Sequence, residues 1–430
     1  MLRKPEQNNF FVINSQGEVA MQLLFCRQMN RFRSRICAQV RLRTGIRTLL
    51  LMCLSGMAVA ATEDQASLSQ KLQDAVPAGV RLVVAEQSDQ FSIPWKISGL
   101  GADAPYNITF ANFNGGPAVL EALVAGAVDV GFIGEAPLPL ALAAGVKDLK
   151  VIAVIANPGS PGNIFLVAQP GSGIHKATDL AGKTIAYPPG TGRHMILSGI
   201  LHSAGLDIRK DIRNVALAGS EVAPTFASRS VDAAIVLGQQ LFRLGSPPII
   251  EDGTGHNWGL NVLVTRQSVL DDPDKVRALA DLTRRAVQVL NWQQRHAEQW
   301  IRASYVKQQG LTYEQGKYLY DKSGLGTYYP IENLLRQVYQ QIADGLYETG
   351  ALQKKVTVDP FLDTRFNEIV AAQNRQDGIV PKQLINDRHA VIASQSVAAP
   401  AGLPKAPAPT TEAKTDSAPI VLARPILTTP

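Results

Sequence analysis

The chain has 430 residues, 46% of them hydrophobic, so it is long enough to bury one large core or two lobes. Its formal net charge of +6 originates in the first 60 residues, which carry nine Lys or Arg and only two Asp or Glu. Residues 61–430 hold 33 basic and 34 acidic side chains, and this balance predicts no nucleic-acid-binding surface there.

The first 61 residues have the order of a secretory signal peptide. The stretch MNRFRSRICAQVRLRTGIR, from Met29, is rich in Arg, and the apolar run TLLLMCLSGMAV and small residues up to Ala60 follow it. The apolar run is shorter than the about 20 residues that span a membrane. We expect export with cleavage near Ala60 or Ala61, with an uncleaved N-terminal anchor as the alternative. A translation start at Met29 would leave residues 1–28 untranslated.

Known catalytic and metal-binding motifs are absent from the sequence. The six histidines are scattered, and neither an HExxH zinc motif nor a GxSxG nucleophile elbow occurs. The three cysteines lie in the leader, so the processed protein would have no disulfide, thiol nucleophile or Cys-based metal site. They are Cys26, Cys37 and Cys53. The sequence therefore predicts no catalytic residue, no metal site and no cofactor.

Short apolar runs alternate with helix-like segments between about Pro77 and Val264. This alternation predicts an α/β architecture with parallel sheets. The expected strands are residues 80–86, 106–113, 128–134, 149–156, 163–169, 183–187, 231–237 and 261–265.

Two segments of this region resemble each other. When Val128–Asp129 is aligned with Val231–Asp232, a helix, a turn, the Val-Asp pair and an apolar strand superpose. Two lobes of similar construction would give this pattern, and so would the common order of elements in α/β proteins. In either case Asp129 and Asp232 are expected to be turn residues at strand starts, not catalytic acids.

The sequence becomes helical after about Asp271. Asp272 is a candidate N-cap, and Pro273 suits the first turn of the helix that follows. Residues 391–430 are rich in Ala, Pro and Thr and are expected to be disordered.

The stretch YPPGTGRHMIL, residues 187–197, is similar to the phosphate-binding loop of ATPases. That loop requires Gly at its first position and Lys followed by Ser or Thr at its end. Here Tyr187, Arg193 and His194 occupy these positions. The sequence therefore excludes an ATPase of this type.

A Gly-rich turn that enters a helix can still bind an anion, because the first N–H groups of the helix are unpaired and lie at its positive end. Thr191 would add a hydroxyl donor, and Arg193 would add a forked guanidinium contact. In the alternative interpretation, Gly190 and Gly192 only permit a tight turn, and Arg193 points to water.

Three further segments follow predicted strands: EQSD at 86–89, GEAP at 134–137 and LGQQ at 237–240. In open α/β sheets, ligands bind beyond the carboxyl ends of the strands. If the chain has two lobes, these strand ends would lie opposite one another across a cleft.

These segments resemble periplasmic solute-binding proteins of the aliphatic-sulfonate, taurine and nitrate group of ABC transporters. The resemblance covers about residues 78–370 and is carried mainly by YNITFANFNGGPAVLEALVAGAVDVGFIGEAPLPLALAAG and ATDLAGKTIAYPPGTGRHMILSGILHSAGL. It implies a two-lobed type II periplasmic-binding-protein fold, in which each lobe is a mainly parallel sheet flanked by helices, with C-terminal helices added. The implied parts are a leader and signal peptide at 1–61, the first part of lobe 1 at 77–170, lobe 2 at 171–257, a return to lobe 1 with C-terminal helices at 258–375, and the tail at 391–430.

The same resemblance implies ligand-binding positions, and the sequence departs from the family at several of them. Leu237, Gly238 and Gln239 replace the usual WDP triplet, and Pro94 interrupts an expected helix after the first strand. In addition, Glu135 replaces an Asp, and Arg193 occupies a position that is usually small. These departures indicate an altered ligand on a retained scaffold. The candidate ligand-binding residues are Gln87, Gly134, Glu135, Pro137, Gly190, Thr191, Gly192, Arg193, His194 and Gln239.

The function implied by the resemblance is capture of an organic sulfonate or a related oxyanion in the periplasm by a monomeric, non-catalytic protein. Its partner would be an ABC transporter permease in the inner membrane. One alternative is an enzyme or precursor-processing protein of thiamine-pyrimidine type on the same scaffold, with Glu135 and His194 as the acid–base candidates. Another alternative is a binding lobe that serves as a sensor or adaptor.

Overall fold

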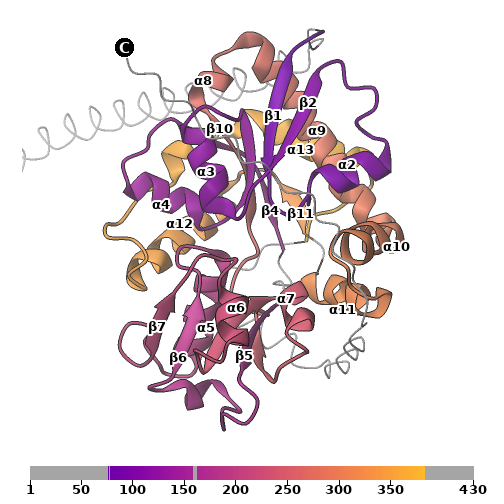
Figure 1. Ribbon diagram of the computed structural model, residues 1–430. Coiled ribbons are helices and arrows are strands. Elements are labelled where there is room, and N and C mark those ends of the chain that lie inside the picture. The colour runs from indigo at the N-terminus through magenta and orange to yellow at the C-terminus, as the bar shows by residue number, and fades with distance from the viewer. Residues whose placement is uncertain (1–75, 77, 158–161, 325, 383–430) are drawn as a thin grey trace, which may run out of the picture. The chain divides into compact units, whose positions relative to one another are not determined.

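The computed structural model describes residues 76, 78–157, 162–324 and 326–382. The predicted leader, the cysteines and the predicted tail lie outside these ranges. Within them the chain builds two β-sheets with helices on both faces (Figure 1). We call the six-stranded sheet and the helices packed on it lobe 1, and the five-stranded sheet and its helices lobe 2.

The sheet of lobe 1 has the strand order β11-β4-β10-β3-β1-β2. Strands β2, β1 and β3 are parallel, whereas β10, β4 and β11 join by antiparallel pairing. The strands are β1 (Arg81–Glu86), β2 (Asn107–Asn112), β3 (Val130–Gly134), β4 (Leu149–Ala156), β10 (Asn261–Arg266) and β11 (Thr327–Tyr329).

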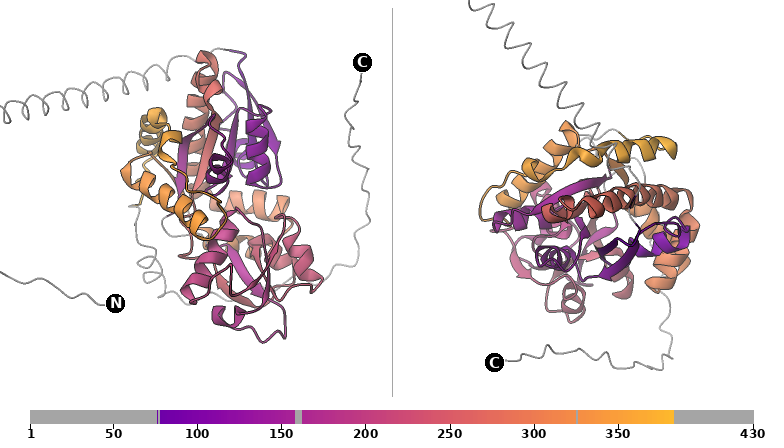
Figure 2. Two further views of the ribbon diagram at one scale, coloured as in Figure 1. Left: turned by 90° about the vertical axis from the view of Figure 1, so that its left-hand side faces the viewer. Right: turned by 90° about the horizontal axis from the view of Figure 1, so that it is seen from above.

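The sheet of lobe 2 has the strand order β7-β6-β8-β5-β9. Strands β7, β6 and β8 are parallel to one another, and β5 is antiparallel to both of its neighbours, β8 and β9. The strands and helices of lobe 2 lie together as one group in Figure 1 and in the left panel of Figure 2. The strands are β5 (Ile164–Ala168), β6 (Thr184–Tyr187), β7 (Arg213–Ala216), β8 (Ala233–Leu237) and β9 (Ile249–Asp252).

The predicted α/β fold and the eight predicted strands are confirmed. However, both sheets are mixed, where the sequence predicted mainly parallel ones. The reason is topological, because β5 and β10 each follow a connection from the other sheet and enter antiparallel to their neighbours. Strands β7, β9 and β11 were not predicted. They have only three or four residues each, a length at which the apolar pattern is a weak signal, although the four-residue β6 was predicted.

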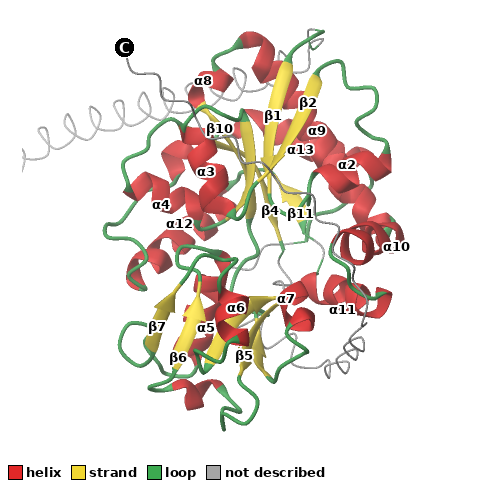
Figure 3. Ribbon diagram, viewed as in Figure 1, coloured by secondary structure: helices red, strands yellow, loops and turns green. Residues whose placement is uncertain are grey.

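Helices cover both faces of the lobe 1 sheet, as Figure 3 shows. Helices α3, α4 and α12 share one apolar core, and α2, α9 and α13 share the other. The helices of this lobe are α2 (Ser92–Ser98), α3 (Gly116–Val124), α4 (Pro137–Ala143), α8 (Gln267–Leu270), α9 (Pro273–Arg295), α10 (Ala297–Trp300), α12 (Asn333–Glu348) and α13 (Asn367–Gln376), with 3-10 turns at Asp359–Phe361 and Thr364–Phe366.

In lobe 2, alternate residues of β5 point to opposite faces of the sheet. Leu166 packs in the core with α5, and Phe165 packs in the core with α6 and α7. Leu311 and Leu319, from the predicted return to lobe 1, also belong to this second core, a feature that the sequence did not predict. The helices here are α5 (Gly192–Ser203), α6 (Val222–Ala227), α7 (Gly238–Arg243) and α11 (Tyr313–Ser323), with the 3-10 turn Ala177–Leu180 and the π-helix Ile301–Gln308.

Helix ends follow the local sequence. The Asp272 carboxylate accepts hydrogen bonds from the N–H groups of Asp274 (2.9 Å) and Lys275 (3.0 Å), which confirms the predicted cap of α9. Pro94 does not interrupt a helix, because it lies in the first turn of α2. First-turn N–H groups have no partner within the helix, so a proline there removes no hydrogen bond.

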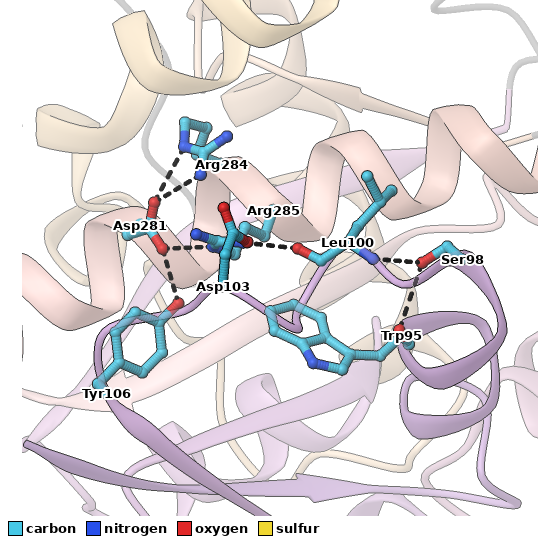
Figure 4. A network of polar contacts seen from close by, with 8 residues as sticks. All are labelled: Trp95, Ser98, Leu100, Asp103, Tyr106, Asp281, Arg284 and Arg285. Carbon is cyan, nitrogen blue, oxygen red and sulfur yellow. Dashed lines mark hydrogen bonds and ion pairs between the residues drawn. The ribbon is translucent and has the colours of Figure 1, made fainter.

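Arg285 of α9 holds the segment between α2 and β2 against the helix (Figure 4). Its guanidinium donates to the Leu100 carbonyl (2.6 Å) and to Asp281 (2.5 Å), and it pairs with Asp103. The Tyr106 hydroxyl also donates to Asp281, at 3.0 Å. The network therefore fixes the chain as it enters the edge strand β2.

Within the ranges that the structure describes, no helix has both the length and the apolar composition to span a bilayer.

Candidate functional site

The Gly-rich turn connects β6 to α5 in lobe 2. Gly190 has φ +66°, and α5 begins at Gly192. Thr191 is the N-cap residue, but its hydroxyl donates to the Pro188 carbonyl (2.8 Å) and does not cap the helix. The hydroxyl is thus engaged within the turn in this structure, and its role as a donor to a ligand stays a prediction. The first N–H groups of α5 receive no side-chain cap from it, which keeps the positive end of the helix available.

Arg193 is the second residue of α5, and it is buried, with 8% of its surface exposed. The interpretation in which it points to water is therefore wrong. Its Nη1 donates to the Gly219 carbonyl (3.4 Å) and to Oε1 of Gln240 (3.5 Å). Both contacts are long, and both acceptors are uncharged.

The positive charge of Arg193 has no acidic partner within 4.0 Å among the described residues. Burial lowers the pKa of Arg193 to about 10, so the guanidinium stays protonated at neutral pH. A buried cation without a counter-ion is costly, and a bound anion would remove most of that cost.

Three strand ends of lobe 2 meet at Arg193. The residue itself follows β6, Gly219 follows β7, and Gln240 follows β8. An added Cβ on Gly219 would lie 2.3 Å from Nη2 of Arg193, so glycine at that position makes room for the guanidinium. The site therefore lies at the carboxyl edge of the parallel strands, where open α/β sheets bind ligands.

His194, the next residue of α5, is a neutral hydrogen-bonding group. Its ring is 3% exposed and lies 5.0 Å from the ring of Tyr187, measured between centroids. The Gly190 N–H donates to its Nδ1 at 3.2 Å, so the proton of the neutral ring is assigned to Nε2. Burial lowers the pKa of His194 to about 4, which keeps the ring uncharged at neutral pH.

The side chain of the predicted residue Gln239 makes no hydrogen bond within the described part of the chain, whereas that of its neighbour Gln240 contacts Arg193. Gln240 also accepts from the Leu237 N–H (3.0 Å), which fixes its side chain at the start of α7. Gln240 belongs to the LGQQ segment that the sequence analysis singled out, although it is not among the candidate ligand-binding residues, and Gly219 was not singled out. A signal for Gln240 was present, because Gln at the third position of a helix commonly accepts from the N-cap N–H.

The predicted residues of lobe 1 lie at the ends of β1 and β3. Nε2 of Gln87 donates to the Phe132 carbonyl at 3.3 Å, and Pro137 begins α4 and is buried. Glu135 is 2% exposed, and its carboxylate accepts from the Leu260 N–H at 3.1 Å. Glu135 therefore connects the end of β3 to the segment that leads into β10. A side chain on Gly134 would meet no atom within 4 Å.

The Gly-rich turn lies close to a helix of lobe 1. An added Cβ on Gly190 would lie 2.4 Å from Cδ1 of Leu140 in α4, the helix that Pro137 begins. The Gly-rich turn thus contacts the helix that follows GEAP. A side chain on Gly192, by contrast, would meet no atom within 4 Å. Among the described residues, no cluster of three or more His, Cys, Asp or Glu could hold a metal ion.

Comparison with known proteins gives consistent matches. Residues 107–297 match the family model described as NMT1/THI5 like. A protein of Escherichia coli strain K12, named for the binding of aliphatic sulfonates, is 29% identical over 255 residues, which are 58% of this chain and 77% of that protein. The alkanesulfonate-binding protein SsuA from Xanthomonas axonopodis pv. citri, solved with MOPS, is 24% identical with a TM-score of 0.60, over 67% of this chain and 99% of that chain.

An enzyme also shares the fold. The structure of a DSZB variant with biphenyl-2-sulfinic acid is 14% identical to this chain, with a TM-score of 0.50, and covers 69% of this chain and 99% of that one. DSZB is described as a desulfurization enzyme. At such identities the likeness establishes the fold alone. The matches together show that this chain has the type II periplasmic-binding-protein fold and contains an NMT1/THI5-like domain, and that it is similar to proteins that bind aliphatic sulfonates.

Proposed function

We propose that this protein captures an organic sulfonate, or a related oxyanion, between its lobes in the periplasm and delivers it to the permease of an ABC importer. The observation that supports this function best is Arg193, a buried cation whose contacts are a carbonyl and an amide. It lies at the N-terminus of α5, where the helix dipole also favours negative charge.

The oxyanion would bind beside the guanidinium, with the first N–H groups of α5 and Nε2 of His194 as further donors. Charge-assisted hydrogen bonds of this kind are stronger than bonds between neutral groups. Gln87 and the loop from Gly134 to Pro137 would approach the ligand from lobe 1. The ligand would then stabilise the closed arrangement, because only that arrangement contacts it from both sides.

A catalytic function is less well supported by the same residues. Glu135 and His194 are the acid–base candidates, but Glu135 accepts from the Leu260 N–H and Nδ1 of His194 accepts from the Gly190 N–H. No described contact joins the two side chains. Incubation with each ligand found to bind, followed by mass spectrometry, would reveal any product and so test the enzymatic alternative.

Thermal unfolding against a ligand panel tests the proposal directly. The panel contains alkane- and arylsulfonates, taurine, sulfate esters, nitrate, bicarbonate and pyrimidines. A ligand at 100 times its Kd adds about 2.7 kcal/mol to the free energy of unfolding, which gives a clear rise in Tm. Stabilisation by one class of oxyanion is the expected result. Stabilisation by pyrimidines alone would contradict the proposal.

A further inference from the structure

We infer that the site in lobe 2 selects oxyanions that carry one negative charge and rejects doubly charged oxyanions of the same size. The inference rests on the proposed function, because it requires an oxyanion to bind beside Arg193. It goes further by specifying the charge of the ligand. It follows from a count of the charged groups that the described residues bring to this site.

Arg193 supplies one positive charge, and its contacts do not change that number. The Gly219 carbonyl and the Gln240 amide are neutral. His194 adds none, because its Nδ1 accepts a hydrogen bond from the Gly190 N–H, and a protonated imidazolium cannot accept one. The site therefore offers one cation and several neutral donors.

The elements around Arg193 contribute little further charge of either sign. Glu221, after the Gly219 loop, is exposed and accepts from the Ala218 N–H at 3.0 Å. Arg243, at the far end of α7, donates to the Gln309 carbonyl. At the far end of α5, His202 is exposed. Glu221 is the acidic group of these elements, and the buried carboxylate of Glu135 lies in the lobe 1 loop that would approach the ligand. Both negative charges would repel a second negative charge on the ligand.

The preference for one negative charge has a simple electrostatic cause. The cost of removing an ion from water grows with the square of its charge, whereas its attraction to a single cation grows only in proportion to the charge. A second negative charge on the ligand therefore raises the cost of removing it from water more than it strengthens the attraction to Arg193. A site with two cations would reverse this balance, but the described residues provide one.

Two ligands of the same shape test the inference. Methyl sulfate carries one negative charge throughout the useful pH range, whereas methyl phosphate gains a second charge as the pH passes its second pKa of about 6. The binding of both to the intact protein is measured by titration calorimetry at pH 5 and pH 8. His194 and Arg193, with pKa values of about 4 and about 10, keep their charges over this interval.

For methyl sulfate we expect Kd values at the two pH values that agree within about twofold, and for methyl phosphate a Kd at least about tenfold higher at pH 8. Equal or tighter binding of methyl phosphate at pH 8 would overturn the inference. The inference also fails if methyl phosphate binds at neither pH while methyl sulfate binds, because the singly charged form is then rejected too. Failure of both ligands at both pH values would also overturn the inference, and the proposed function itself would be refuted if no oxyanion of the panel bound either.

A variant with no net charge at the site gives a second test. Gln240→Glu places a carboxylate beside Arg193, and a Glu oxygen can still accept from the Leu237 N–H. We expect its affinity for methyl sulfate to fall at least about tenfold, with an unchanged or higher Tm, because the buried Arg gains a partner. Ser203→Asp adds the same charge at the other end of α5 and should bind like the wild type. Wild-type affinity in Gln240→Glu would contradict the charge count.

Discussion

The two lobes share one strand plan. In lobe 1 the order β2-β1-β3 is parallel and continues with antiparallel β10 and β4, and in lobe 2 the order β7-β6-β8 continues with antiparallel β5 and β9. The aspartates at the two strand starts match as well. Asp129 accepts from the Val83 N–H (2.9 Å), and Asp232 accepts from the Thr184 N–H (2.7 Å). The repeated Val-Asp pattern in the sequence therefore corresponds to the same strand junction in each lobe.

The lobes differ at the carboxyl edge of their parallel strands. In lobe 1 the charged groups there are bonded within the lobe: Glu86 accepts from the N–H groups of Phe91 and Ser92, and Glu135 accepts from that of Leu260. In lobe 2, Arg193 has only neutral contacts. The named contacts are neutral groups in both lobes, but the buried charge is positive in lobe 2 and negative in lobe 1. We therefore expect lobe 2 to determine ligand charge and lobe 1 to contribute mainly shape.

Arg193→Met should have the largest effect of the substitutions considered, because it removes the buried positive charge of lobe 2. It removes the charge while keeping much of the side-chain length, and we expect at least 100-fold weaker oxyanion binding, about 2.7 kcal/mol. Folding should be preserved, because the variant no longer buries a charge. Arg209→Met, at an exposed position of the same lobe, serves as the matched control. Calorimetric titration of both variants measures the effect, and equal affinities would show that Arg193 has no role in binding.

The two strand-start aspartates should differ in their effect on stability. Asp129 also pairs with Lys275 at 2.8 Å, whereas Asp232 forms no ion pair with any of the described residues. We expect Asp129→Ala to lower the free energy of unfolding by about 3 kcal/mol and Asp232→Ala by about 1.5 kcal/mol. Urea denaturation measures both values. Asp129→Asn keeps an acceptor for the Val83 N–H and should lose less than Asp129→Ala. Equal losses for the two alanine variants would show that the Lys275 pair contributes nothing.

His194 should make the stability of the protein depend on pH. Burial lowers its pKa to about 4 in the folded state, whereas the unfolded chain titrates near the usual value of about 6.5. Between these values the unfolded state binds more protons, so stability falls as the pH is lowered. From pH 7 to pH 5 this residue should account for a loss of about 2 kcal/mol.

The pH effect is tested with His194→Gln, which cannot titrate. Its free energy of unfolding should fall less than that of the wild type between pH 7 and pH 5, and the difference should be about 2 kcal/mol. His175→Gln removes an exposed histidine and should leave the wild-type slope unchanged. If both variants retain the full slope, burial of His194 is not its cause.

The sequence predicted local features well and long-range contacts less well. The capped start of α9 and the long apolar strands depend on neighbouring residues, and both were confirmed. The antiparallel entry of β5 and β10 depends on which sheet the chain has just left, which no local pattern encodes. Similarly, the burial of Arg193 depends on Gly219 and Gln240, 26 and 47 positions away. The bond from the Thr191 hydroxyl to the Pro188 carbonyl was not predicted either, because it depends on the conformation of the turn.

The smallest predicted effect concerns the contact of the Gly-rich turn with lobe 1. Gly190 and Gly182 both have φ near +70°, but only a side chain on Gly190 would meet Leu140, since none of the described atoms lies within 4 Å of a Cβ on Gly182. Gly182→Ala should therefore lower the free energy of unfolding by about 1 kcal/mol, the cost of placing a residue with a Cβ at positive φ. Gly190→Ala should lower it by about 1 kcal/mol more, because its Cβ also clashes with Leu140. If the clash with Leu140 causes this further loss of stability, Gly190→Ala should cost no more than Gly182→Ala when it is made in the Leu140→Ala background. A double variant whose losses simply add would mean that the turn and α4 do not restrict each other.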